Sequence, residues 1–395
     1  MAAQKLCENL YSVGVMNPAL RVFDIVMTAR YGTTYNAYLI RGEKTVLVET
    51  VHEDFFDEYF ETLCSVVDPA SIDALVMNHT EPDHSGSIQK LLEKLPNLTI
   101  YASAGGKKFL DAQINRPCDI HVVKDGETLE TGMGTLRFLI APMLHWPDSM
   151  FTFCEQNGVL FSCDFLGAHY CEPRLFDDLS SHPAQYEEEF AYYYQGIFGP
   201  FKPHVLNGLS KIDALPLQMV CPSHGPVLRE SFRRRMEQYR AWSAPAPAAA
   251  KKTVAVVYCS AYGYTAQLAK AAAAALEGDY DVRLLDAVTE EVSACAAALM
   301  DADAVLVGAC TINRDVPGRM WQVLSSVDAY AMAGKPAGTF GSYGWTGEGP
   351  ALLRDRLCGL KLRLIGEPKK VCFRPTDEDL SAMAAYAREV AGAIK

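Results

Sequence analysis

Hydrophobic runs of strand length recur in the C-terminal part of the chain. Residues Thr253–Tyr258 read TVAVVY, a continuous apolar run rich in β-branched residues, which is typical of a strand buried on both faces of a parallel sheet. Asp303–Gly308 and Pro336–Phe340 repeat this pattern, and the alanine-rich segment Thr265–Leu276 predicts a helix after the first run. Alternating strands and helices of this kind predict an open, doubly wound parallel sheet.

The N-terminal part has a different pattern, with many short strands. Tyr35–Ile40 and Thr45–Glu49 predict a hairpin that turns through 41–44. Six further strands are predicted at Ala74–Asn78, Leu98–Ala102, Ile120–Val123, Thr135–Ala141, Met150–Cys154 and Gly158–Ser162. Helices are predicted near Asp54–Val66, Ser85–Leu92, Gly106–Ile114, Gln185–Tyr194 and Arg229–Trp242. Strands flanked by several helices predict an α/β sandwich built on two sheets.

A segment of alternating proline and alanine separates the two patterns. Residues 243–250 read SAPAPAAA and are followed by two lysines. This composition favours an extended, semi-rigid spacer. The predicted organisation is a first domain at 1–245, a linker at 246–252 and a second domain at 253–395, and a length of 395 residues is typical of two domains.

Composition and charge narrow the class of partner. The net charge is −12, which argues against nucleic-acid binding, because that binding depends on clustered positive charge. No apolar stretch approaches the roughly 20 residues that span a bilayer, and 1–11 lack the pattern of a signal peptide. The twelve cysteines form no CxxC pair. We therefore expect a cytoplasmic protein with reduced thiols and no membrane segment.

Histidine is confined to the first 224 residues, and four of the nine histidines belong to a candidate metal site. His79, Glu81, Asp83 and His84 lie within six residues, between a predicted strand and a predicted helix. Three further candidate ligands each follow a predicted strand: His145, Asp164 and His224. Four histidines and three carboxylates suffice for two metal ions with one bridging carboxylate, and this donor set suits iron, manganese or zinc. For the histidines at 52, 121, 169, 182 and 204 an ordinary structural role is favoured.

The second domain carries three loops that suit a phosphorylated ligand. Residues 260–265 read SAYGYT and open a helix, where hydroxyl and backbone N–H groups bind anions. The other two loops are 310–313, CTIN, and 342–349, SYGWTGEG, each after a predicted strand. The carboxyl ends of parallel strands are where a doubly wound sheet binds ligands.

These motifs together resemble the flavodiiron proteins, or A-type flavoproteins. The segment 79–84, HTEPDH, is similar to the HxHxDH signature of the metallo-β-lactamase fold, with Glu81 in place of the second histidine, and His145, Asp164 and His224 follow 61, 19 and 60 positions on. The loop at 260–265 resembles the phosphate loop of flavodoxins, which bind FMN. The resemblance covers nearly the whole chain and implies a metallo-β-lactamase-like αββα sandwich followed by a flavodoxin-like doubly wound parallel sheet.

The resemblance also implies the roles of individual residues. One iron is held by His79, Glu81 and His145 and the other by Asp83, His84 and His224, with Asp164 as the bridge. FMN-binding residues are expected at Ser260, Ala261, Tyr262, Gly263, Tyr264, Thr265, Thr311, Ile312, Asn313, Ser342, Tyr343, Gly344, Trp345, Gly347, Glu348 and Gly349. Tyr343 and Trp345 are expected to flank the isoalloxazine ring. Gly344, Gly347 and Gly349 are expected to let the backbone approach it. Tyr193 or Tyr194 is expected in the substrate pocket.

The implied function is an oxidoreductase in which reduced FMN passes electrons to a diiron centre. The centre reduces dioxygen to water, nitric oxide to nitrous oxide, or both, and the sequence leaves this choice open. The electron donor is expected to be a separate protein, rubredoxin by resemblance, and the assembly a head-to-tail homodimer or a tetramer. Two alternatives are a zinc hydrolase fused to a flavodoxin module, against which Glu81 weighs, and a plain electron carrier whose first domain is structural.

Overall fold

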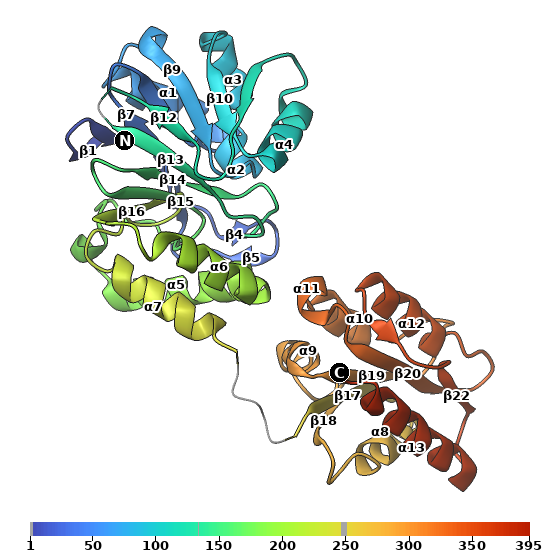
Figure 1. Cartoon of the computed structure of the whole chain (residues 1–395). Coiled ribbons are helices and arrows are strands. Elements are labelled where there is room, and N and C mark those ends of the chain that lie inside the picture. The colour runs from blue at the N-terminus through green and yellow to red at the C-terminus, as the bar shows by residue number, and fades with distance from the viewer. Residues whose placement is uncertain (1–2, 133, 246–250) are drawn as a thin grey trace. The chain divides into compact units, whose positions relative to one another are not determined.

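The computed structural model describes residues 3–132, 134–245 and 251–395, and the chain divides into two compact units, Met1–Pro245 and Ala246–Lys395 (Figure 1). Of the expected linker at 246–252, only residues 251 and 252 lie among the described residues. Each unit has its own sheets and its own hydrophobic core. Within the described ranges, no helix has both the length and the apolar character needed to cross a bilayer.

The first unit contains two stacked sheets. The larger has the strand order β1 (Gln4–Cys7), β2 (Leu10–Ser12), β7 (Tyr38–Ile40), β8 (Thr45–Val48), β9 (Ile72–Met77), β10 (Thr99–Ala102) and β11 (Asp119–Val122). The smaller has the order β12 (Thr128–Glu130), β13 (Thr135–Ile140), β14 (Met150–Cys154), β15 (Val159–Cys163) and β16 (Met219–Pro222). Two short ribbons pair β3 (Val15–Asn17) with β6 (Thr33–Tyr35) and β4 (Val22–Phe23) with β5 (Met27–Thr28).

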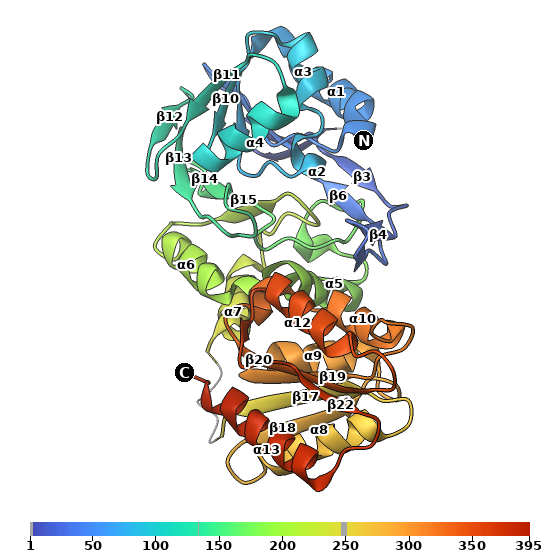
Figure 2. The same ribbon diagram turned by 90° about the vertical axis from the view of Figure 1, so that its right-hand side faces the viewer.

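Helices cover both outer faces of this sheet pair. The larger sheet is covered by α1 (Phe56–Cys64), α3 (Ile88–Lys94) and α4 (Ala104–Ile114), and the smaller by α5 (Pro183–Tyr193), α6 (Lys202–Ile212) and α7 (Phe232–Ser243) (Figures 1 and 2). A third core, which includes Val46, Val76, Phe138 and Phe161, lies between the sheets. The expected αββα sandwich is therefore present, and β14 and β15 are buried along their whole length because both of their faces are covered.

One local prediction for this unit was wrong, and one helix was not predicted. The predicted strand Tyr35–Ile40 is two strands, β6 and β7, which belong to different sheets. The chain breaks at Asn36, whose side-chain amide donates to the carbonyl oxygens of Pro222 and Gly225 instead of facing a strand partner. Helix α6 was not predicted, because its sequence contains Pro203 near its start and Gly208 within it.

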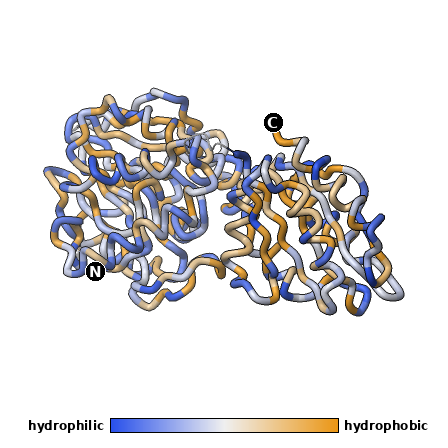
Figure 3. Tube along the Cα trace, turned by 90° about the horizontal axis from the view of Figure 1, so that it is seen from below, coloured by the Kyte–Doolittle hydropathy of each residue, from blue (hydrophilic) through white to orange (hydrophobic). Residues whose placement is uncertain are grey.

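The second unit is one parallel sheet between two layers of helices. Its strand order is β18 (Asp281–Asp286), β17 (Thr253–Cys259), β19 (Ala304–Ala309), β20 (Pro336–Tyr343) and β21 (Arg363–Leu364), and β22 (Lys369–Cys372) also pairs with β20. One face packs on α8 (Tyr264–Ala274) and α13 (Asp377–Gly392), the other on α9 (Val292–Asp301), α10 (Gly318–Ser325), α11 (Ala329–Met332) and α12 (Gly349–Gly359). The central strands β17, β19 and β20 are almost entirely buried, and hydrophobic stretches run through the interior of this unit (Figure 3). The strand order reverses between β17 and β19, and ligands bind at such a point at the carboxyl ends of the strands.

Candidate functional site

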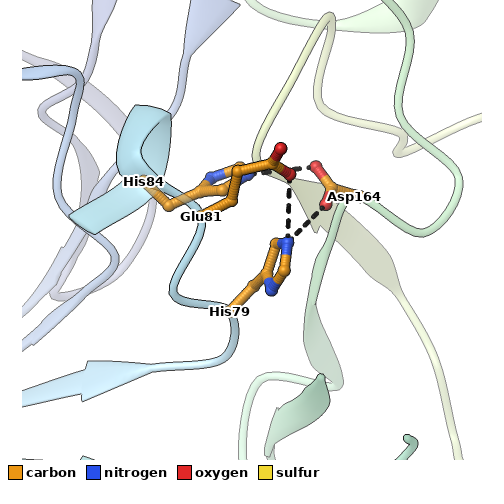
Figure 4. Close-up of side chains that lie close together, drawn as sticks. All are labelled: His79, Glu81, His84 and Asp164. Carbon is orange, nitrogen blue, oxygen red and sulfur yellow. Dashed lines mark hydrogen bonds and ion pairs between the residues drawn. The ribbon is translucent and has the colours of Figure 1, made fainter. Parts of the chain in front are cut away.

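The seven predicted metal ligands come together at one edge of the two stacked sheets. His79 and Glu81 lie in the loop after β9, and Asp83 and His84 lie on the short helix α2 (Pro82–Ser85). The other three lie between β13 and β14, after β15 and after β16: His145, Asp164 and His224. Strand ends of both sheets therefore contribute, and Figure 4 shows four of these side chains converging. Two groups of side chains have ligand atoms mutually within 4.8 Å: His79, Glu81, His84 and Asp164; and Asp83, His84 and His224.

Asp164 lies between the two sets of histidines. Its Oδ2 is 3.5 Å from Nε2 of His79 and 3.6 Å from Nε2 of His145. Its Oδ1 is 3.1 Å from Nε2 of His84 and 3.4 Å from Nε2 of His224. One carboxylate thus presents a different oxygen to each set, which is the geometry that a carboxylate bridging two metal ions requires.

The outer carboxylates complete the two sets. Oε2 of Glu81 lies 3.2 Å from Nε2 of His79 and 3.2 Å from Nε2 of His145. On the other side, Oδ2 of Asp83 lies 3.0 Å from Nε2 of His224. Each set therefore combines two imidazole groups with one carboxylate of its own.

The buried polar atoms of this cluster fit metal ions. Both oxygens of Asp83, Oδ2 of Asp164 and Nε2 of His84 are buried without a hydrogen bond, which is costly for such groups unless another partner binds them. Burial opposes ionisation of Asp164, but the neighbouring imidazole groups, foremost that of His84, hold its pKa well below the ordinary value. Burial likewise opposes charge on His84, but Asp83 and Asp164 raise its pKa to about 10. The carboxylates attract cations, and the donor set is that of iron, manganese or zinc.

Neighbouring residues orient two of the imidazole rings. Asp148 Oδ2 lies 3.0 Å from Nδ1 of His79 and also accepts the backbone N–H of Thr80 at 2.8 Å. Nδ1 of His224 lies 2.6 Å from the carbonyl oxygen of Thr34. Because Nδ1 is occupied in both rings, Nε2 is left to face the carboxylates, as in most metal-binding histidines.

Only one of the two candidate tyrosines reaches the cluster. The hydroxyl of Tyr193, at the end of α5, donates to Oδ1 of Asp164 at 3.1 Å. Tyr194, which begins a turn of π-helix, bonds instead to Ser243 Oγ at 2.7 Å and packs against Trp242 and Tyr239. One step along a helix turns a side chain by about 100°, so the two tyrosines point to different sides.

Three residues near the cluster were not predicted from the sequence to belong to the site. Asp148 lies three positions after His145, and this short spacing from a predicted ligand could have identified it. His169 is buried, bonds Thr33 Oγ1 through Nδ1 at 2.9 Å, and has a pKa of about 3 because of burial and then the nearby His224. Asp24, in the turn between β4 and β5, meets the carboxyl group of Glu81, and desolvation and this contact raise its pKa to about 7. The last two contacts join distant parts of the chain.

In the second unit, the three predicted loops lie at the carboxyl ends of β17, β19 and β20. Hydrogen bonds connect them, among them Thr265 Oγ1 with Ser342 Oγ at 2.8 Å and the Gly349 N–H with Thr311 Oγ1 at 3.0 Å. Helix α8 starts after Gly263, which has a φ of 81° and supplies no side chain to cap the helix. The first N–H groups of α8 and the buried, unpaired hydroxyl of Ser260 therefore fit a phosphate group.

The other expected FMN-binding residues lie around these loops. Those with exposed side chains are Ala261, Tyr262, Ile312, Asn313 and Trp345, and those half-buried are Tyr264, Tyr343, Gly344, Gly347 and Glu348. Three of the glycines in these loops lie against side chains of the same unit. A Cβ on Gly344 would meet the ring of Phe373, and one on Gly347 would meet the ring of Tyr343. A Cβ on Gly349 would meet Oγ1 of Thr311. These glycines make room for side chains of the same unit.

Known proteins resemble this chain over its whole length. The family model for "ODP family beta lactamase" matches residues 33–225. The flavo-diiron protein FprA2 of Clostridium acetobutylicum is 43% identical over 100% of both chains, and the type A flavoprotein fprA of Rhodobacter capsulatus is 36% identical over 98% of this chain and 90% of its own. Among solved structures, the rubredoxin oxygen:oxidoreductase of Desulfovibrio gigas superposes with a TM-score of 0.70 at 30% identity and covers 99% of this chain and 98% of its own.

Proposed function

The chain belongs to the flavodiiron proteins, oxidoreductases that carry FMN and a non-haem diiron centre, and on that premise we propose that it reduces dioxygen to water, nitric oxide to nitrous oxide, or both. Dioxygen requires four electrons and four protons for two waters, and two molecules of nitric oxide require two of each for nitrous oxide and one water. When bound, one FMN supplies up to two electrons and two ferrous ions one each, which equals the four that dioxygen needs.

We assign the iron ligands by the two sets of contacts. His79, Glu81 and His145 hold one iron, and Asp83, His84 and His224 hold the other. Asp164 would bridge the two, and the position of its two oxygens between the two sets of histidines is the single observation that carries the proposal. FMN is assigned to the loops after β17, β19 and β20, with its phosphate at Ser260 and the start of α8.

The chain's own side chains prepare the metal pocket for this chemistry. Asp148 and the Thr34 carbonyl oxygen fix the rings of His79 and His224. The hydroxyl of Tyr193 donates a hydrogen bond to Asp164 Oδ1. Burial, and secondly the charge of Asp164, raise the pKa of this tyrosine well above its ordinary value, so it remains protonated at neutral pH. The ring of Phe198 meets that of His145 edge to face and places an apolar side chain beside the cluster.

The electrons come from outside the chain in this proposal. One solved relative is a rubredoxin oxygen:oxidoreductase, and this supports rubredoxin as the donor. We further propose a head-to-tail homodimer, alone or paired into a tetramer, as the working assembly.

Metal analysis and gas kinetics test the function. Protein from iron-replete cells should contain two irons per chain, whereas two zincs would favour a hydrolase. Steady-state consumption of dioxygen and of nitric oxide, measured with the same reductant, should show at least one gas reduced and determines the preference. Protein that holds two irons and FMN but reduces neither gas would contradict the proposal.

A further inference from the structure

Large apolar side chains are exposed at the carboxyl ends of four strands of the second unit. Tyr262, Ile312 and Trp345 follow β17, β19 and β20, with 87%, 46% and 83% of their surfaces exposed. Phe373, which directly follows β22, is 60% exposed. Exposed aromatic and aliphatic side chains grouped at one edge of a sheet indicate a surface that a ligand covers. The first three belong to the predicted flavin loops, whereas Phe373 does not.

Phe373 is built into the loop that carries Trp345. Its backbone N–H donates to the carbonyl oxygen of Tyr343 at 2.7 Å. The pairing of β22 with β20 places Cys372 opposite Tyr343, so Phe373 is adjacent to the start of that loop. The ring of Phe373 covers Gly344, where a Cβ would lie only 3.1 Å from its Cζ. Any larger residue at position 344 would displace either the ring or the loop.

The backbone of Phe373 is held in an unusual conformation. Its φ is 56°, in the left-handed region that a bulky residue rarely adopts. A residue stays in such a conformation only where its surroundings determine it, and such residues gather at ligand sites. The result is an aromatic ring that packs on the Trp345 loop with one side and faces solvent with the rest.

We propose that Phe373 positions the Trp345 loop and forms, together with Trp345, the apolar rim that receives the isoalloxazine ring of FMN. This inference rests on the proposed FMN site and adds a fourth strand end, that of β22, to it. Aromatic pairs of this kind contribute affinity beyond the area that they bury. The rim contacts the ring and not the phosphate, so its contribution is the same for FMN and for riboflavin.

The test measures flavin affinity in the full-length chain after removal of FMN. FMN and riboflavin are titrated separately, with quenching of flavin fluorescence as the signal. The variants are Phe373→Ala, Phe373→Leu, Phe373→Tyr, Trp345→Ala and Ser260→Ala. Val288→Ala, another exposed apolar residue of the same unit, is the matched control. Thermal unfolding and visible circular dichroism of the bound flavin are recorded for each.

The expected result is a five- to tenfold rise in the dissociation constants of both flavins for Phe373→Ala. Phe373→Tyr should retain wild-type affinity and the wild-type dichroism of the flavin, and Phe373→Leu should show the loss even where Phe373→Ala does not fold. Ser260→Ala should weaken FMN but not riboflavin, and Val288→Ala neither.

Two results would overturn the inference, and they differ. Wild-type affinity in folded Phe373→Ala and Phe373→Leu, with loss in Trp345→Ala and Ser260→Ala, would exclude Phe373 and leave the FMN site in place. Wild-type affinity in all of these variants would show that the FMN site itself is assigned wrongly.

Discussion

Asp164 is the residue on which the two halves of the candidate metal centre depend. A ligand that serves one metal ion can be lost with half of the site intact, but a bridge cannot. Its carboxylate also accepts the hydrogen bond of the Tyr193 hydroxyl, so it connects this tyrosine to the metal centre.

Removal of Asp164 should therefore disturb both metal positions. We expect Asp164→Ala to lose most of its iron and all gas reduction while retaining FMN, because the flavin loops lie in the other unit. Metal analysis and the flavin absorption spectrum measure the two cofactors separately. Asp111→Ala, which removes an exposed carboxylate paired with Lys107, is the control and should change neither. Full iron content with near-normal turnover in Asp164→Ala would refute the bridge.

Substitution of Asp148 should weaken metal binding without abolishing it. Asp148→Asn keeps the size of the side chain but removes the charge that orients His79. Loss of such an outer partner costs about 10–100-fold in metal affinity. Competition with a chelator should show this loss for about one of the two irons, since the side-chain Oδ2 of Asp148 bonds to His79 and Thr80 and His79 belongs to one of the two sets. Equal weakening of both irons would show that Asp148 supports the whole cluster.

The difference between these two aspartates shows what the sequence can reveal at this scale. The candidate ligands could be proposed from the sequence because four of them lie within six residues and the other three follow strands. The partners of the ligands were not, because Thr34 meets His224 and Asp24 meets Glu81 across large separations in the chain. Such contacts depend on the fold, and nothing local to Thr34 or Asp24 signals them.

Among the elements, the break between β6 and β7 has the clearest link to the site. Asn36 is buried, and its amide donates to the carbonyl oxygens of Pro222 and Gly225 at 2.8 Å each. These two residues flank the turn that carries His224. A strand that continued through Asn36 would remove these two hydrogen bonds from the turn, which Tyr38 also supports by donating its hydroxyl to the Pro222 carbonyl oxygen at 2.6 Å.

Asn36→Ala should consequently lower stability more than an ordinary loop substitution does. Each hydrogen bond contributes about 0.5–1.5 kcal/mol net, so losing the two bonds of the Asn36 amide should lower the free energy of unfolding by about 1–3 kcal/mol. Urea unfolding of the iron-free protein measures this cost without the contribution of the metal. Asn207→Ala, on the exposed side of α6, should change the free energy of unfolding by less than about 0.5 kcal/mol. A cost for Asn36→Ala as small as that of the control would exclude the supporting role.

The elements of the second unit were the easier ones to predict. Its central strands are continuous apolar runs, and they are buried on both faces, so pattern and structure agree for β17, β19 and β20. The short strands β1 to β5 of the first unit span two to four residues each and carry too little pattern to detect. β1 pairs with β2 and β4 with β5, whereas β2 also pairs with β7 and β3 pairs with β6 farther along the chain.

At the scale of the whole molecule, each unit is expected to carry one cofactor, and electrons must pass between them. The expected linker at 246–252 would reach at most about 23–25 Å when fully extended, and the alternating proline and alanine of this stretch favour extension. Electron transfer needs the cofactors nearly in contact, because its rate falls steeply with distance. A head-to-tail pair, in which the flavin unit of each chain serves the metal unit of the other, meets both requirements, and closed two-fold dimers are the commonest oligomers.

Complementation tests this arrangement. One variant lacks iron, through His79→Ala with Asp164→Ala, and the other lacks FMN, through Ser260→Ala with Trp345→Ala. Neither homodimer should reduce gas. After subunit exchange, a heterodimer should regain one working site, because the intact flavin unit of the first variant then faces the intact metal unit of the second. Mass measurement of the exchanged heterodimer is the control. Exchange without any return of activity would show that each chain serves its own metal centre, and the spacer would then have to allow the two units of one chain to meet.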